Sequence, residues 1–230
     1  MVSSRTPAAL AVLAGLSLFA VSLSRPVTAP ASVALPSAAL APNPAAQLRF
    51  VVAPEGNEAR YRVREQLASL DFPNDAVGAT SAITGAIVVD SDGSIVREQS
   101  KFVVDLRPLK SDRDRRDNYI QRRTLETAQH PNVELVPTSF RGLSFTTQLS
   151  GPQTFELIAD LTIKGVTKPT TWNVTARFDG GKVSGSAATA FTFEDFGMTK
   201  PRVASVLSVA DTIKLEYDFT LVPETPPASR

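Results

Sequence analysis

Residues 155–197 read FELIADLTIKGVTKPTTWNVTARFDGGKVSGSAATAFTFEDFG, and this stretch decides the fold. Apolar side chains recur at every second position in three runs, which is the pattern of β-strands with one dry face. The first two runs place on that face Phe155, Leu157, Ala159, Leu161 and Ile163, and then Trp172, Val174, Ala176 and Phe178. Gly165 and Pro169 bracket the first predicted turn, and Asp179-Gly180-Gly181 tolerates the positive φ of the second. We therefore expect three consecutive antiparallel strands.

The third of these runs has small residues in the middle of its dry face. Its inward positions are Val183, Gly185, Ala187, Thr189, Phe191 and Phe193. Small inward residues either permit a tight bend or the close approach of another element, or they line a ligand cavity. The sequence favours neither interpretation over the other.

Alternating runs also predict strands on both sides of this stretch. They cover residues 48–52, 61–67, 83–89, 102–106, 133–140 and 213–221, whereas residues 70–80 and 198–208 are expected to be loops. Glu65 is an acid on an otherwise apolar strand face. It indicates a register bulge or a solvated edge of the barrel, or alternatively a contact with a ligand.

One helix is predicted, over residues 112–123. Ser111 and Asp114 have the spacing of a capping box, and basic residues gather in the last turn. The helix is either a surface helix held by salt bridges, or its basic residues form a cationic ring at a cavity mouth that meets an anionic head group. The basic residues concerned are Lys110, Arg113, Arg115 and Arg116.

The strands each need a cover for their apolar face, and a single helix is too little to provide it. The sheet must therefore cover itself, as a closed up-and-down barrel of about eight strands or as a sandwich. We predict an all-β fold with one inserted helix.

Composition excludes several classes of function. The chain is 43% hydrophobic and 20% charged with a net charge of +1, so a nucleic-acid partner is not expected. It has no cysteine, and His130 is its single histidine, so neither a metal site nor a Ser-His-Asp triad is predicted. Arginines alternate with the acids near residue 112, which is unsuited to general acid catalysis. We expect a binding module without cofactor, with a ligand-free structural or adhesive domain, or an enzyme acting on a lipid, as alternatives.

The N-terminal region predicts export. Arg5 precedes an apolar run at residues 8–23 that is shorter than a membrane span, which is typical of a signal peptide, with a retained signal anchor as the alternative. We assign residues 1–24 to this leader, 25–46 to a Pro/Ala-rich linker, 47–222 to the folded domain and 223–230 to a disordered tail. The domain is then periplasmic, extracellular or tethered to the outer side of a membrane through its N-terminal segment.

Several motifs resemble the YceI-like family of exported lipid-binding proteins. They are LTIKGVTKPT at residues 161–170, Asp195-Phe196-Gly197, Arg116-Asp117 and His130-Pro131, and the resemblance covers roughly residues 59–222. It implies a lipocalin-like barrel that holds a polyisoprenoid or another long-chain lipid.

The resemblance also implies where the ligand lies. Residues expected to line the interior are Phe155, Leu157, Ala159, Leu161, Trp172, Val174, Gly185, Ala187, Phe191, Phe193, Tyr217 and Phe219. Arg113, Arg116 and Asp117 are the candidate contacts for a head group, although Thr124-Leu125 and Phe193-Glu194 depart from the family pattern nearby. We therefore expect Arg116 and Asp117 chiefly to fasten the helix to the barrel.

Overall fold

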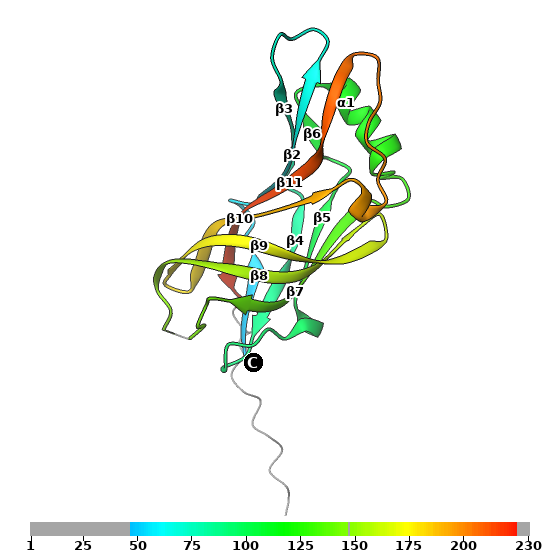
Figure 1. Ribbon diagram of the computed structural model, residues 1–230. Coiled ribbons are helices and arrows are strands. Elements are labelled where there is room, and N and C mark those ends of the chain that lie inside the picture. The colour runs from blue at the N-terminus through cyan, green and yellow to red at the C-terminus, as the bar shows by residue number, and fades with distance from the viewer. Residues whose placement is uncertain (1–46, 147, 225–230) are drawn as a thin grey trace, which may run out of the picture. The chain divides into compact units, whose positions relative to one another are not determined.

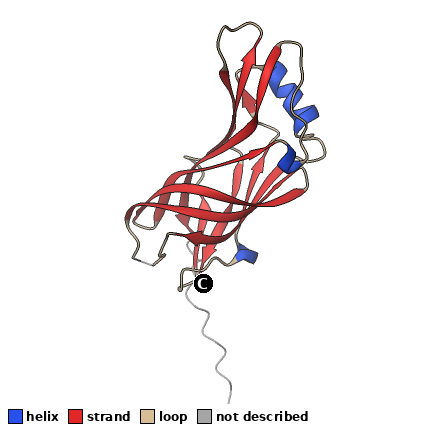
Figure 2. Ribbon diagram, viewed as in Figure 1, coloured by secondary structure: helices blue, strands red, loops and turns tan. Residues whose placement is uncertain are grey.

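The computed structural model describes residues 47–146 and 148–224, which belong to one compact unit. The predicted leader and linker, residues 1–46, and all of the predicted tail beyond residue 224 lie outside the described residues. Strands dominate the described part, as Figure 2 shows. They are β1 (Leu48–Val52), β2 (Glu58–Leu67), β3 (Asn74–Thr80), β4 (Ile83–Val89), β5 (Lys101–Asp105), β6 (Lys110–Ser111), β7 (Asn132–Arg141), β8 (Gly151–Ile163), β9 (Val166–Asp179), β10 (Lys182–Thr192) and β11 (Val206–Pro223).

The sheet closes on itself through eight antiparallel strands in the order β1-β4-β5-β7-β8-β9-β10-β11. The ring is completed where β1 pairs with the end of β11, with Phe50 opposite Pro223 and Val52 opposite Leu221. The expected alternation fills the interior: in β9, Trp172 and Val174 are buried while the residues between and beside them are exposed. This closure confirms the predicted barrel and removes the sandwich alternative.

Three further strands extend the sheet beyond one end of the barrel. β11 pairs with β1 only near its end, whereas residues 206–218 pair with β2. β3 then pairs with β2, and β6 with β3, so that the extension stands above the barrel next to α1 in Figure 1. The expectation of a loop over residues 70–80 was wrong for β3. Its buried positions are the small residues Ala76, Gly78 and Thr80, which give little strand signal of their own.

The turns show where glycine is required. Gly180 and Gly181 have φ of 55° and 89°, as predicted for the turn between β9 and β10. The turn between β8 and β9 is tighter than expected, because Lys164 and Gly165 form it alone and Pro169 lies within β9 opposite Asp160. The β10 ladder to β9 stops at Asn173, so the missing N–H of Pro169 breaks no bond of that ladder.

The predicted helix is present as two short segments, α1 (Asp114–Tyr119) and a π-helical turn, η2 (Ile120–Thr124). The predicted capping box does not form. Arg113 is the N-cap residue and makes no side-chain cap, while the Ser111 hydroxyl bonds to Asp117 at 2.6 Å. Two single 3₁₀ turns, η1 (Arg97–Gln99) and η3 (Glu194–Phe196), complete the described elements.

Candidate functional site

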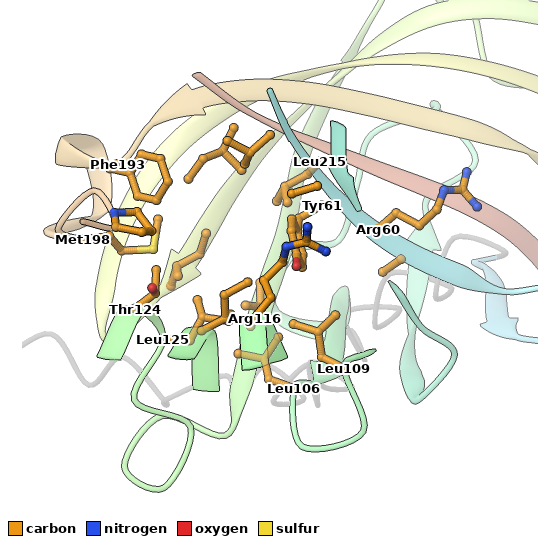
Figure 3. Close-up of a pocket in the computed structure, with 18 of the residues that line it drawn as sticks. Arg60, Tyr61, Leu106, Leu109, Arg116, Thr124, Leu125, Phe193, Met198 and Leu215 are labelled. Carbon is orange, nitrogen blue, oxygen red and sulfur yellow. The ribbon is translucent and has the colours of Figure 1, made fainter. Parts of the chain in front are cut away.

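The principal candidate site is a cavity of about 490 Å³ between the upper end of the barrel, the strand extension and α1. Figure 3 shows side chains from several elements converging on it, among them Tyr61, Leu125, Phe193 and Leu215. Most of the lining is aliphatic or aromatic because the inward positions of β2, β5, β7, β10 and β11 face it. A cavity of this size and composition is typical of a site for a small apolar ligand.

Four side chains separate this cavity from a second one deeper in the barrel. Phe102, Leu135, Trp172 and Tyr217 border both cavities, and we call them the partition. The second cavity has a volume of about 90 Å³ and its lining is otherwise aliphatic and phenyl side chains.

Hydrogen bonds hold two members of the partition in place. The Tyr217 hydroxyl donates to Asn57 Oδ1 at 3.0 Å, and Trp172 Nε1 donates to Thr170 Oγ1 at 3.0 Å. Asn57 is itself fixed, since its amide donates to the Ala53 carbonyl at 2.8 Å. Burial raises the pKa of Tyr217 above its usual range, so this hydroxyl keeps its proton for the bond. Hydrogen bonds thus fix the positions of two of the four side chains that divide the barrel interior.

The expected lining residues divide between the two cavities. Leu161, Phe191 and Phe193 border the larger one, Trp172 and Tyr217 belong to the partition, and the smaller one is bordered by Phe155, Leu157, Val174, Ala187 and Phe219. Ala159 and Gly185 border neither. A Cβ on Gly185 would lie 2.1 Å from the Thr175 carbonyl oxygen, and one on Gly85 would lie 2.2 Å from the Lys101 carbonyl oxygen. Both glycines therefore serve close strand approach, which was one of the two interpretations open from the sequence.

Arg116 fastens α1 to the barrel wall. Its guanidinium donates to Glu65 Oε1 at 2.6 Å and also to Asp112, and the Arg116 and Glu65 side chains are 11% and 8% exposed. Burial alone would lower the pKa of Arg116, but the hydrogen bonds to Asp112 and Glu65 outweigh it and raise that pKa. The expectation that Glu65 lies at a solvated edge was wrong, although the β11 register does shift opposite it, between Val209 and Ile213.

The three candidate head-group residues differ in position. Arg113 and Arg116 border the larger cavity, whereas Asp117 does not. Asp117 Oδ1 accepts from the Ser111 backbone N–H at 2.9 Å and from its hydroxyl, so Asp117 ties the start of α1 to β6.

Tyr61 is a site residue that the sequence did not single out. It borders the larger cavity, and its hydroxyl oxygen is buried without a hydrogen-bond partner among the described residues. Burial raises the pKa of Tyr61 to about 12. Its ring covers Gly78 on the neighbouring strand, since a Cβ there would meet the ring at 2.2 Å. Only the pairing of an aromatic residue with a glycine on adjacent strands could have indicated it.

Leu106, at the end of the predicted strand 102–106, also borders the cavity, as do Leu109 and Met198 from segments outside the predicted strands. They are buried, and Met198 belongs to the main hydrophobic core. Within the described ranges, no three His, Asp or Glu side chains are close enough together to bind a metal ion. None of the helices in the part of the chain that the structure describes has the length and apolar composition needed to cross a membrane.

The sequence from residue 50 to residue 221 matches the YceI-like domain. The chain belongs to the YceI-like family. UPF0312 proteins of Pseudomonas putida are 32% identical over 117 residues, a match that covers 47% of this chain and 57% of the relatives' length.

Several solved structures share the fold at low sequence identity. A polyisoprenoid binding domain from Saccharophagus degradans, implicated in plant cell wall breakdown, superposes with a TM-score of 0.57 at 12% identity, over 76% of this chain and 98% of that one. BcnA of Burkholderia cenocepacia superposes with a TM-score of 0.53 at 13% identity, over 71% of this chain and 95% of that one. The YCEI protein of Campylobacter jejuni superposes with a TM-score of 0.53 at 16% identity, over 70% of this chain and 91% of that one.

Proposed function

We propose that this YceI-like protein binds the apolar tail of an isoprenoid or similar long-chain amphiphilic lipid in its larger cavity, without catalysing a reaction on it. The observation that carries the proposal is the apolar cavity of about 490 Å³ in the barrel of a YceI-like domain. The relative from Saccharophagus degradans, which is a polyisoprenoid binding domain, supports the same ligand class. Each methylene moved from water into such a cavity contributes about 0.8 kcal/mol, so binding needs no catalytic group.

We further propose that the protein acts outside the cytoplasm as a carrier or scavenger. The support for this part is the leader-like sequence of residues 1–24. Intact-mass measurement of the protein from its native host tests it, because removal of the leader shortens the chain and a retained anchor does not. Recovery of the full-length chain from the cytoplasm would contradict export.

Organic extraction of the purified protein followed by mass spectrometry tests lipid binding. A matched pair of substitutions then tests where the lipid lies. Ala76 borders the larger cavity and Ala187 the smaller one, and both are buried. We expect Ala76→Phe to remove most of the co-purified lipid, while Ala187→Phe retains it because that side chain fills only the smaller cavity. If the parent protein carries no lipid and binds no added polyprenyl ligand, the alternative of a ligand-free structural domain is favoured instead.

A further inference from the structure

The larger cavity opens at one end of the molecule. Among its lining residues, the exposed ones are Ser69, Arg113, Arg115, Val203 and Ser205. They come from only three segments: the turn between β2 and β3, the start of α1, and the chain that leads into β11. These three segments therefore form the mouth of the cavity.

Exposed apolar side chains gather at this mouth. Large exposed hydrophobic residues in the described part of the chain are Leu70, Phe72, Val166, Val203 and Leu207. Leu70, Phe72 and Val203 lie in the mouth segments, and Leu207 is the second residue of β11, next to one of them. Phe72 is 80% exposed and Leu207 is 68% exposed. We call Leu70, Phe72, Val203 and Leu207 the apolar tip. A cluster of exposed apolar residues marks an interaction surface, whereas scattered ones do not.

The two halves of the apolar tip are joined by the backbone. The Ala68 N–H donates to the Ser205 carbonyl at 3.0 Å, and Val206 pairs with Leu67 in the sheet. These contacts hold the turn after β2 beside the start of β11, above the barrel in Figure 1. The tip is therefore a single surface, continuous with the apolar lining of the cavity behind it.

Basic residues flank the apolar tip. Residues 110–123 contain six basic and three acidic side chains, and residues 198–208 contain two basic and no acidic ones, in a chain whose net charge is only +1. Asp112 and Arg116 occupy each other, and Asp117 bonds to Ser111, which leaves five basic side chains and Asp114 in this region. Lys200 and Arg202 are both exposed. Asp71, within the turn, is the acidic side chain that opposes this bias.

We infer that this end of the molecule docks on an anionic lipid bilayer, with the apolar tip in the interfacial layer and the basic residues over the head groups. Apolar burial and attraction between basic side chains and anionic lipids add together in such docking. A bilayer fits this surface better than a protein partner, because the tip adjoins the cavity mouth and a lipid tail can then pass between the two without crossing water. Docking itself does not depend on the proposed lipid binding, and only the transfer step rests on it.

The chain has no cysteine, so a single introduced cysteine can be labelled uniquely in the full-length protein. The test uses an environment-sensitive fluorophore on Leu207→Cys, with a matched label on Val166→Cys, the exposed apolar residue outside the apolar tip. Because the label reports its own surroundings, membrane contact through residues 1–24 does not produce the signal. On vesicles of phosphatidylcholine with phosphatidylglycerol, we expect the fluorescence emission of the label at position 207 to shift to shorter wavelength, as it does in apolar surroundings. The emission of the label at position 166 should not shift.

Two further variants test the separate contributions of apolar burial and of charge to membrane docking. In the Leu207→Cys background, Phe72→Ser should raise the lipid concentration needed for the half-maximal signal by about ten-fold, since a buried phenyl group is lost. Lys200→Gln with Arg202→Gln should weaken the response to the anionic vesicles and leave the response to phosphatidylcholine alone unchanged. The inference is overturned if the labels at 207 and 166 respond equally, if Phe72→Ser has no effect, or if the response ignores phosphatidylglycerol.

Lipid extraction from the same preparations separates this inference from the proposed function. A protein that retains bound lipid but gives no signal at position 207 contradicts docking alone. A protein that gives the signal but never contains lipid contradicts the proposed function alone.

Discussion

The partition predicts an upper limit on the length of tail that the larger cavity accepts. A methylene group occupies about 30 Å³, the volume of a water molecule in the liquid, so the cavity of about 490 Å³ holds about sixteen of them. Each added methylene should strengthen binding by about 0.8 kcal/mol, or about four-fold. This gain should stop near sixteen carbons, where the tail meets the indole of Trp172 and its three partners.

Trp172→Leu should move this limit. The smaller side chain opens the partition onto the second cavity, whose volume of about 90 Å³ admits about three more methylenes. The assay is competition between a fluorescent apolar probe and monoalkyl phosphates of increasing tail length, with the affinity plotted against the number of carbons. We expect the plateau of the Trp172→Leu protein to begin at least three carbons later than that of the parent.

Phe178→Leu is the matched control. Phe178 lies on the same strand and borders the smaller cavity but not the larger one, so this variant enlarges the space below the partition without opening it. Its plateau should coincide with that of the parent. The reasoning is refuted if the parent shows no plateau, or if Phe178→Leu shifts the plateau as far as Trp172→Leu does.

Three further predictions concern stability. Glu65→Gln should lower the free energy of unfolding in urea by up to about 3–5 kcal/mol, because its buried partner Arg116 then keeps only the carboxylate of the exposed Asp112. Glu156→Gln, which breaks an exposed pair of the same 2.6 Å length, should cost at most about 1 kcal/mol, and equal costs would contradict this reasoning. Gly185→Ala should cost at least about 1–3 kcal/mol in the same assay, since the facing backbone cannot move aside, and an unchanged midpoint would show that the strands separate freely. The Tyr61 hydroxyl loses its proton above pH ~10 in the unfolded chain, whereas the folded state holds the proton up to about pH 12. The free energy of unfolding should therefore fall as the pH rises across this interval, and Tyr61→Phe should make that fall less steep. A pH profile identical to that of the parent would exclude Tyr61 as its source.

The barrel could be predicted from the sequence because its strands and turns are each specified by residues that are close together in the chain. Alternation along β8 and β9 fixes which face is dry, and the turn glycines fix where the chain reverses. β3 was missed for the opposite reason. Its inward residues are alanine, glycine and threonine, and the strand exists because β2 on one side and β6 on the other supply its hydrogen bonds.

The candidate site was predicted only in part, because its division into two cavities is a property of three-dimensional packing. Alternation correctly placed Trp172 and Tyr217 on inward positions. It does not tell which of the inward residues along the barrel divide the interior into two cavities. What distinguishes these two is the pair of hydrogen bonds to Thr170 and Asn57. Asn57 lies in the break between β1 and β2, 160 positions from Tyr217 in the sequence, and no periodicity connects them.

The irregular segments at the upper end of the barrel decide where the larger cavity opens. The regular strands supply the wall and, through the partition, the inner end of the larger cavity, whereas the turn after β2, the start of α1 and the segment before β11 form its mouth. Changes in those mouth segments should alter membrane contact without altering the strand ladder, since few of their residues take part in it. Membrane docking should therefore vary independently of stability in this protein, whereas tail-length preference should not. Phe72→Ser and Trp172→Leu test this contrast, because Phe72 lies outside the core and Trp172 within it.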